Sequence, residues 1–191
     1  YNINEVCLSK QFDVIIHLAS VILVYEMIKN PKPNLTNNIN STLNLLEDIR
    51  LNNPDCLLIY ASSDKVYGNS TKELVSEDDI GIPTDPYGSS KLISELLIKS
   101  YQMNYNLKNI ILRMGNIFGP GQSPGLFIPS VISRIANDEK EIAIGNLEAY
   151  RNFVYINDVI DAFIKSINNN AAVNEIFNIT AYNLKIAEVL E

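Results

Sequence analysis

The sequence predicts an α/β fold in which a parallel sheet is covered by helices on both faces. Three short runs rich in β-branched and other apolar residues, at positions 12–19, 56–61 and 109–113, have the composition of buried strands. Longer segments with helical patterns separate them. Strand, helix, strand, helix, strand is the order of a parallel sheet with helices on both sides. Ligands of such sheets bind at the carboxyl ends of the strands.

The two helices are expected over residues 35–51 and 87–105. The first follows a proline-marked segment, Asn30–Pro33, and carries apolar residues at helical spacing (39, 43, 46 and 49). The second is predicted to bury an apolar stripe formed by Leu92, Ile93, Leu96, Leu97 and Tyr101. Residues 66–85 hold Gly, Ser, Asp and Pro and are typical of a loop.

The pattern becomes more mixed beyond Pro120. The expected elements are a loop at 121–125, a helix at 127–136, a short strand at 142–144, a helix at 157–167, a strand at 175–179 and a further helix from Leu184. The chain begins with Tyr1 rather than Met and ends at Glu191 within that last expected helix. We therefore expect a fragment of a longer protein.

Composition narrows the class of protein. The chain has 191 residues, of which 47% are hydrophobic and 19% charged, which fits a globular protein with a substantial core. A net charge of −7 argues against nucleic acid or an anionic membrane as a partner. No apolar run approaches the ~20 residues of a membrane span. Cys7 and Cys56 form neither a disulfide framework nor a metal site, so we expect buried thiols in a reducing, cytoplasmic compartment.

Tyr87 and Lys91 are the strongest candidates for chemistry. They stand four residues apart at the start of the second expected helix and so share one face. Ser63, at the end of the strand 56–61, could complete a proton-transfer group beside them. The charge of Lys91 is expected to lower the pKa of Tyr87 from about 10, which would make the phenol a usable base. Tyr25 and Lys29 repeat the spacing without a preceding strand end, and we interpret them as an ordinary helix pair.

Six stretches, in order along the chain, resemble the extended short-chain dehydrogenases/reductases, specifically the NAD-dependent nucleotide-sugar epimerase/dehydratase family. They are Asp13–Ala19, Asn38–Leu46, Ser62–Gly68, Pro86–Lys91, Leu112–Gly121 and Arg151–Val159.

The resemblance implies a Rossmann-type, doubly wound sheet and a smaller carboxyl-terminal region for a nucleotide-diphosphate sugar. Residues 1–121 would be a truncated NAD-binding domain, and residues 122–191 a partial sugar-nucleotide region interleaved with it. The glycine-rich turn of the family, which holds the cofactor pyrophosphate, does not occur here. We therefore expect that the first strands are missing and that this fragment is inactive by itself. NADP is not excluded, because the residue that selects the ribose would lie in the missing segment.

The resemblance also implies roles for individual residues. Tyr87 would be the catalytic base, Lys91 its electrostatic partner and a ribose ligand, and Ser63 the hydroxyl on the reacting sugar oxygen. Two further residues, Ala19 and Ser62, would line the cofactor.

Asn116 and Arg151 would face the substrate diphosphate, where the guanidinium fork suits phosphate. A surface ion pair is the alternative for Arg151. His17 is expected to be a packed strand-end residue. Asp158 is expected to be a helix-start residue.

Asp64 and Lys65 bear on which reaction is catalysed. In the 4,6-dehydratases of this family an Asp-Glu pair follows the serine, the acid protonating the C6 hydroxyl and the base removing the C5 proton. Asp64 is present, and Lys65 in the second place resembles the CDP-glucose 4,6-dehydratases. Other stretches resemble GDP-mannose 4,6-dehydratases. A neutral Lys65 could take the C5 proton; alternatively, it only pairs with an acidic neighbour.

The resemblance thus favours an NAD-dependent nucleotide-sugar 4,6-dehydratase. The alternatives are a 4-epimerase, which would need Ser63, Tyr87 and Lys91 but not Asp64, a 4-keto-sugar reductase, and a non-catalytic nucleotide-binding scaffold. A homodimer paired through the helix that carries Tyr87 and Lys91 is also expected from the resemblance.

Overall fold

The computed structural model describes residues 11–69 and 75–191, so the prediction for Cys7 lies outside the described residues. The chain divides into two compact units, which are described separately. The first contains the described residues up to Met114 together with Phe163–Asn178. The second contains Gly115–Ala162 and Ile179–Glu191. The boundary at residue 121 between cofactor and substrate regions stays a prediction.

A four-stranded sheet forms the centre of the first unit, in the order β1 (Val14–His17), β2 (Leu57–Ser63), β3 (Asn109–Met114), β6 (Ile176–Ile179). β1 pairs with β2 in parallel, with Val14 opposite Leu57, and β2 pairs with β3 in parallel, with Leu58 opposite Asn109. The predicted parallel sheet is confirmed.

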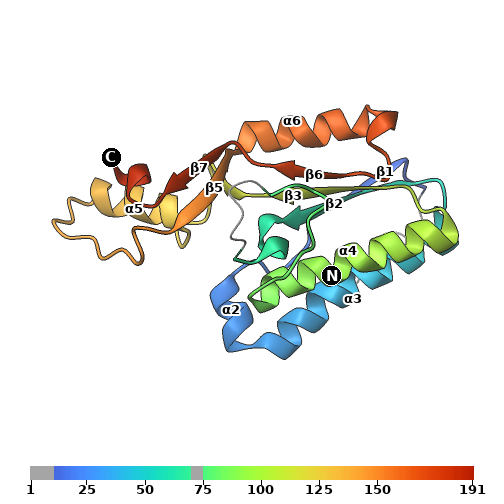
Figure 1. The fold of residues 1–191 in the computed structure, drawn as a ribbon, viewed down its shortest axis with the longest axis horizontal. Helices are drawn as coiled ribbons and strands as arrows, with labels where there is room; N and C mark the ends of the chain where they lie inside the picture. The colour runs from blue at the N-terminus through green and yellow to red at the C-terminus, as the bar shows by residue number, and fades with distance from the viewer. Residues whose placement is uncertain (1–10, 70–74) are drawn as a thin grey trace. The chain divides into compact units, whose positions relative to one another are not determined.

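Helices cover this sheet. α3 (Pro31–Asn52) and α4 (Pro86–Tyr105) lie side by side on one face, with the short α2 (Val24–Lys29) at one end (Figure 1). Residues 163–167 of α6 (Ile156–Ile167), which belong to this unit, lie over the opposite face (Figure 1). The α/β class with both faces covered is therefore confirmed.

Prolines set the starts of both long helices. α3 begins at Pro31, earlier than the expected start at Leu35, because proline is well tolerated in a first helical turn, where its missing N–H would have no partner. α4 begins at Pro86, and the Asp85 side chain caps it by accepting a hydrogen bond from the Gly88 N–H at 2.8 Å.

The core between the sheet and these helices is apolar, but α4 contributes to it differently from the prediction. Buried Leu58, Tyr60 and Ile111 of the sheet pack with Leu46 and Ile49 of α3. α4 buries mainly its polar side, formed by Gly88, Ser90, Lys91, Ser94, Glu95 and Ile98.

The predicted apolar stripe of α4 is consequently wrong in part. Leu96 is 62% exposed and Ile93 38% exposed, whereas Leu97 and Tyr101 pack partly against the core. Hydrophobic periodicity misplaced the buried face because buried polar residues with internal partners occupy it.

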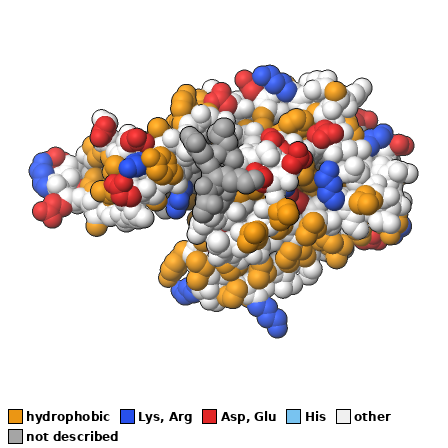
Figure 2. All heavy atoms as spheres, viewed as in Figure 1, with side chains coloured by type: hydrophobic (Ala, Val, Ile, Leu, Met, Phe, Trp, Pro, Cys, Tyr) orange, Lys and Arg blue, Asp and Glu red, His pale blue; other side chains and the backbone are white. Residues whose placement is uncertain are grey.

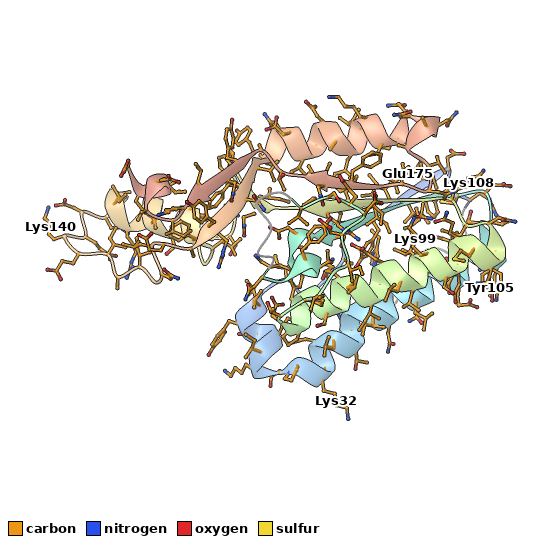
Figure 3. All side chains as sticks on the ribbon, viewed as in Figure 1. Lys32, Lys99, Tyr105, Lys108, Lys140 and Glu175 are labelled. Carbon is orange, nitrogen blue, oxygen red and sulfur yellow. The ribbon has the colours of Figure 1, made fainter. Side chains whose placement is uncertain are left out.

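The far end of α4 is tied to the chain just before β6. Lys99 Nζ donates a hydrogen bond to the Asn174 carbonyl at 2.9 Å. Figure 3 shows Lys99 on α4 and Glu175, the next residue after Asn174, toward the end of the unit where Lys108 lies.

The second unit contains a three-stranded sheet in the order β4 (Asn116–Phe118), β5 (Tyr150–Tyr155), β7 (Tyr182–Lys185). β4 and β5 are parallel, and β5 and β7 are antiparallel. α5 (Phe127–Ala136) agrees with the expected helix. Three short 3-10 turns complete the fold: η1 (Asp64–Tyr67) and η2 (Asn170–Ala172) in the first unit, and η3 (Glu188–Leu190) in the second.

Two predicted elements of this unit are wrong. Residues 142–144 form no strand, and the segment from Leu184 is the end of β7 followed by η3 rather than a helix. Leu184 pairs with Arg151 of β5, so a long-range ladder overrides the local helical pattern.

Across the described ranges, 11–69 and 75–191, no helix is both long enough and apolar enough to cross a bilayer. Cys56 is buried, as predicted.

Candidate active site

The candidate site of the first unit is built at the carboxyl end of β2, where the strand runs into η1. The Ser63 hydroxyl donates a hydrogen bond to Asp64 Oδ1 at 3.2 Å and accepts one from the Lys65 N–H at 3.3 Å. Lys65 Nζ lies 3.9 Å from Asp64 Oδ1. Ser63 is 7% exposed, and the side chains of Asp64 and Lys65 are 16% and 29% exposed. The serine is thus fixed, while the two charged groups remain open to a ligand.

The first turn of α4 packs tightly against this strand end. Gly88 is so close to η1 that an added Cβ would overlap the Lys65 carbonyl oxygen. Only glycine allows this approach without a shift of the backbone. The contact brings Tyr87, the preceding residue, beside Ser63, whose hydrogen bond acts on the phenol.

The expected lowering of the pKa of Tyr87 is wrong for the protein without ligands. Burial of the phenol raises its pKa to about 12, and the charges of Asp64 and Asp85 act in the same direction. The hydrogen bond with Ser63 opposes this increase. Lys91 does not offset burial, because its ammonium is directed to a backbone carbonyl and lies 5.7 Å from the centre of the Tyr87 ring.

Lys91 is buried beneath the tyrosine. It is 3% exposed, its Nζ donates to the Ala61 carbonyl at 2.8 Å, and the same atom lies 5.0 Å from the centre of the Tyr60 ring. The pKa of Lys91 is lowered to about 8, because burial disfavours the charged amine more than the carboxylate of Glu95 favours it. An ammonium has three donors, so two remain after the bond to Ala61.

His17 is a packed residue, as predicted. It is 5% exposed at the end of β1, and its ring lies against Tyr60 with centroids 5.6 Å apart. Its Nε2 lies 3.2 Å from the Thr42 hydroxyl, which itself donates to the Asn38 carbonyl. With that single hydroxyl proton committed, the imidazole must carry its own proton on Nε2. Burial, assisted by the charge of Lys91, lowers the pKa of His17 to about 4.

Ser62 has an internal partner. It is 2% exposed and points to the face of the sheet that α4 covers, where the hydroxyl donates to Glu95 Oε1 at 2.5 Å. Successive strand residues face opposite sides of a sheet, so Ser62 cannot share the orientation of Ser63. The hydroxyl expected to line a cofactor therefore belongs to the packing of α4.

Three buried polar residues near the site were not singled out from the sequence. Glu95 and Arg113 form an ion pair with a closest approach of 2.7 Å. The Asn38 side chain accepts a hydrogen bond from the Val21 N–H and donates to the Val21 carbonyl and, at 3.1 Å, to the Ser90 hydroxyl. The spacing of Tyr87, Lys91 and Glu95 at successive four-residue steps could have pointed to Glu95. Nothing local pointed to Arg113 and Asn38, because their partners are distant in the sequence.

Ala19, expected to line the cofactor, is an exposed residue of the segment that follows β1. It therefore lies at the carboxyl end of its strand, as do Ser63 and Asp64.

The remaining predicted residues lie in the second unit. Asn116, in β4, donates to the Asn152 carbonyl of β5 at 3.1 Å. Arg151, in β5, is exposed, and its Nη1 donates to the Tyr150 carbonyl at 2.8 Å. Asp158 stands in the first turn of α6, as expected.

The first unit thus assembles a hydroxyl, a phenol, a buried ammonium and a carboxylate that is 16% exposed at one strand end. This set can exchange protons with an alcohol and with a leaving hydroxyl group. In the part of the chain that the structure describes, no cluster of three or more His, Cys, Asp or Glu side chains could hold a metal ion.

Comparison with known proteins agrees with this arrangement. Residues 2–180 match the NAD dependent epimerase/dehydratase family. The chain belongs to this family. The chain is accordingly an extended short-chain dehydrogenase/reductase with a Rossmann-type fold.

Individual relatives carry out more than one reaction. A dTDP-D-glucose 4,6-dehydratase of Dictyostelium discoideum is 36% identical over 165 residues, covering 81% of this chain and 38% of the relative. The UDP-N-acetylglucosamine 4-epimerase of Methanobrevibacter ruminantium M1, solved with UDP-N-acetylmuramic acid, has a TM-score of 0.85 at 30% identity, covering 93% of this chain and 58% of that one. The UDP-glucuronic acid 4-epimerase of Bacillus cereus, solved with UDP-glucuronic acid and NAD, has a TM-score of 0.84 at 31% identity, covering 93% and 57%.

This chain therefore spans between about two fifths and three fifths of the length of these relatives.

Proposed function

We propose that the protein is an NAD-dependent nucleotide-sugar 4,6-dehydratase. The observation that carries this proposal is Asp64, a carboxylate only partly covered by the protein, 3.2 Å from the Ser63 hydroxyl and beside Tyr87. Oxidation at C4 of a sugar needs only the phenol, the serine and the lysine. A carboxyl group at the same place supplies what a dehydratase needs in addition, an acid for the hydroxyl that leaves from C6.

The residues present fit a nicotinamide cofactor. Lys91 is buried with two donors beyond its bond to Ala61, and two ribose hydroxyls would use them. Ala19 lies at the neighbouring strand end, where parallel sheets bind such ligands. Bound NAD would supply the acceptor for the two electrons removed from C4 and would return them at C6.

Tyr87 is the proposed base for the C4 hydroxyl, and Ser63 holds the same oxygen. With a pKa of about 12 the phenol alone gives up its proton too rarely near neutral pH. Lys91, with its ammonium 5.7 Å from the ring centre, does not lower that pKa enough by itself, and the positive charge of a bound nicotinamide ring beside the phenol would lower it further. Proton-transfer steps of this kind are typically worth about 10²–10⁴-fold in rate.

Asp64 and Lys65 are the proposed acid and base of the elimination. A protonated Asp64 gives its proton to the C6 oxygen as the C6–O bond breaks, and a neutral Lys65 takes the proton from C5 as the C5–C6 double bond forms. The products are water, a carboxylate and an ammonium. The ion pair seen at 3.9 Å has the charges of that product state. Once a hydride has been returned to C6, C5 would take back a proton from Lys65, and the proton that Tyr87 accepted from the C4 hydroxyl would restore Asp64 by exchange with water, so that the hexose gives one 4-keto-6-deoxy sugar and one water.

A 4-epimerase is the second candidate, favoured by the likeness to the two solved 4-epimerases. In epimerisation Asp64 and Lys65 would transfer no proton and would form only an ion pair. Asn116 and Arg151 are proposed diphosphate ligands in either case, because their roles concern binding rather than the reaction.

Product analysis separates the candidates. The whole protein is incubated with NAD⁺ and, separately, with CDP-, GDP-, UDP- and dTDP-hexoses, and the products are followed by NMR. A dehydratase gives a 4-keto-6-deoxy sugar, and Asp64→Asn removes that activity while Asp158→Asn, an exposed helix-start control, retains it. An inverted C4 centre with the C6 hydroxyl intact would contradict the proposal and leave the epimerase. No conversion in any arm would favour a reductase or a scaffold.

We further propose that the protein forms a homodimer through α4. Ile93, Leu96 and Met103 of this helix are 38%, 62% and 82% exposed, and Figure 2 shows apolar side chains gathered over α4. Such a stripe is costly to leave in water. Light scattering should give twice the chain mass, and Leu96→Lys should reduce it to that of one chain. Ile80→Lys, a control at a residue 86% exposed outside the helices, should leave the dimer intact.

A further inference from the structure

We propose that Glu95 is a positioning residue of this site: its buried carboxylate fixes α4 to the ends of β2 and β3 and keeps the Lys91 amine in its charged form. The chemical role of Lys91 rests on the proposed function, but the contacts of Glu95 do not.

Glu95 continues the line of functional residues along α4. Tyr87, Lys91 and Glu95 follow one another at four-residue steps, so their side chains lie on one face of the helix, each one turn further from its start. That face is turned to the sheet, as the burial of Lys91 and Glu95, both 3% exposed, shows. The helix therefore presents a phenol, an amine and a carboxylate in succession to the end of β2.

The carboxylate binds both central strands at once. Its Oε1 accepts from the Ser62 hydroxyl at 2.5 Å, and the Arg113 guanidinium donates to both oxygens, with Nη2 2.7 Å from Oε2 and Nε 3.1 Å from Oε1. Ser62 and Arg113 are paired across β2 and β3. Glu95 thus lies beside this pair of residues, which is next to the pair that contains Ser63. Glu95 therefore adds a side-chain link between α4, which carries Tyr87, and both strands, beside the bond from Lys91 to Ala61.

The same network reaches the turn that carries Asp64 and Lys65. Arg113 Nη1 donates to the Tyr67 hydroxyl at 2.6 Å and to the Glu77 carbonyl at 3.0 Å. Tyr67 is the last residue of η1. Arg113 therefore links the Glu95 carboxylate to the far end of the turn whose first residue is Asp64.

Glu95 also stabilises the charged form of Lys91. Burial disfavours a charged amine. The groups that face Lys91 are neutral His17 from β1, Tyr60 from β2, and Tyr87 and Glu95 from α4 itself. Of these, Glu95 carries the negative charge that favours the ammonium, and it is paired with Arg113 of β3. Without it, a lysine whose pKa is already about 8 would lose its proton at lower pH.

The test measures the charge of Lys91 directly. Lysine is labelled with ¹³C and ¹⁵N, the Lys91 signal is assigned by its loss in Lys91→Arg, and its Nζ shift is followed from pH 6 to 11. In Glu95→Gln the titration midpoint should fall by about one pH unit, a tenfold loss in proton affinity. Glu47→Gln is the matched control: Glu47 also binds an arginine and a hydroxyl, Arg50 and Tyr101, but away from Lys91. In Glu47→Gln the titration midpoint of Lys91 should equal that of the unchanged protein.

An unchanged midpoint in a folded Glu95→Gln protein would overturn the proposal. If that variant fails to fold because Arg113 is left without a counter-ion, the paired variant Glu95→Gln/Arg113→Gln removes both buried charges and is titrated instead. A smaller fall is expected there, because loss of the Arg113 charge acts in the opposite direction to loss of the Glu95 charge, and a midpoint that does not fall is again contradictory.

The readout needs no substrate, so it is independent of the proposed function. A lowered midpoint together with no product from any nucleotide sugar would keep this role for Glu95 and reject the dehydratase. Where product does form, Glu95→Gln should lower kcat and move its pH profile in step with the Lys91 titration, with KM for the sugar nucleotide retained. A purely structural role would alter stability without moving that profile.

Discussion

Replacing Arg113 with methionine tests whether the buried ion pair behind the site is required for stability. Arg113 and Glu95 have side chains 6% and 3% exposed, and their charged atoms approach to 2.7 Å. Arg113→Met keeps the aliphatic volume but leaves the Glu95 carboxylate buried, with the Ser62 hydroxyl as its remaining donor. Removing one partner of a buried pair typically costs about 3–5 kcal/mol of unfolding free energy.

The chain contains its own control for this change. Glu47 and Arg50 of α3 form an ion pair with the same closest approach, 2.7 Å, but with side chains 40% and 31% exposed. Arg50→Met should therefore have little effect, because water and salt already screen an exposed pair. Urea unfolding followed by circular dichroism measures both variants against the unchanged protein.

Comparable losses in the two variants would refute the reasoning, because burial would then not be the deciding variable. The double variant Glu95→Leu/Arg113→Met adds a second arm. Since it leaves no unpaired charge inside, it should recover most of the stability that Arg113→Met loses.

Three further predictions concern single residues. Tyr87→Phe should reduce kcat by about 10²–10⁴-fold with an unchanged unfolding midpoint. Tyr25→Phe, in the second copy of the Tyr-Lys spacing, should leave kcat intact, and equal effects of the two changes would contradict the role of Tyr87 as base. The pKa of His17 falls from 6.5 to about 4 on folding, so the unfolded state binds the extra proton and stability should decline as pH falls from about 6.5 to 4. His17→Gln should remove that part of the slope, and an unaltered slope would show that His17 is not its source. Asn38→Ala should cost about 1–3 kcal/mol of unfolding free energy, because a buried side chain loses three hydrogen bonds. Asn104→Ala, with one exposed bond, should cost far less, and a similar loss in both would be contradictory.

Much of the first unit follows from the sequence. β-branched runs are continuous where strands are buried on both faces, and all four strands predicted for this sheet, together with the helix carrying Tyr87 and Lys91, occur at nearly the expected positions. Ser63, Asp64 and Lys65 follow one another at the end of β2, and the close approach of α4 to η1 brings Tyr87 to them.

The errors arise where distant contacts decide the outcome. The buried side of α4 holds Lys91 and Glu95, whose partners Ala61, Ser62 and Arg113 belong to the sheet, so no local periodicity marks it. The high pKa of Tyr87 depends in the same way on burial, which spacing along a helix does not show.

β7 provides a second example. Its residues have a helical local pattern, and only pairing with β5 makes them a strand.

The central claim is tested most directly by following the hydrogen at C4. The nucleotide hexose that the protein converts is prepared with deuterium at that carbon, and the product is examined by ²H and ¹³C NMR. A dehydratase that uses Tyr87 as base and Asp64 as acid should deliver the deuterium to the C6 methyl group of a 4-keto product. Deuterium that remains at C4, with the C6 hydroxyl still present, would contradict the account and identify an epimerase.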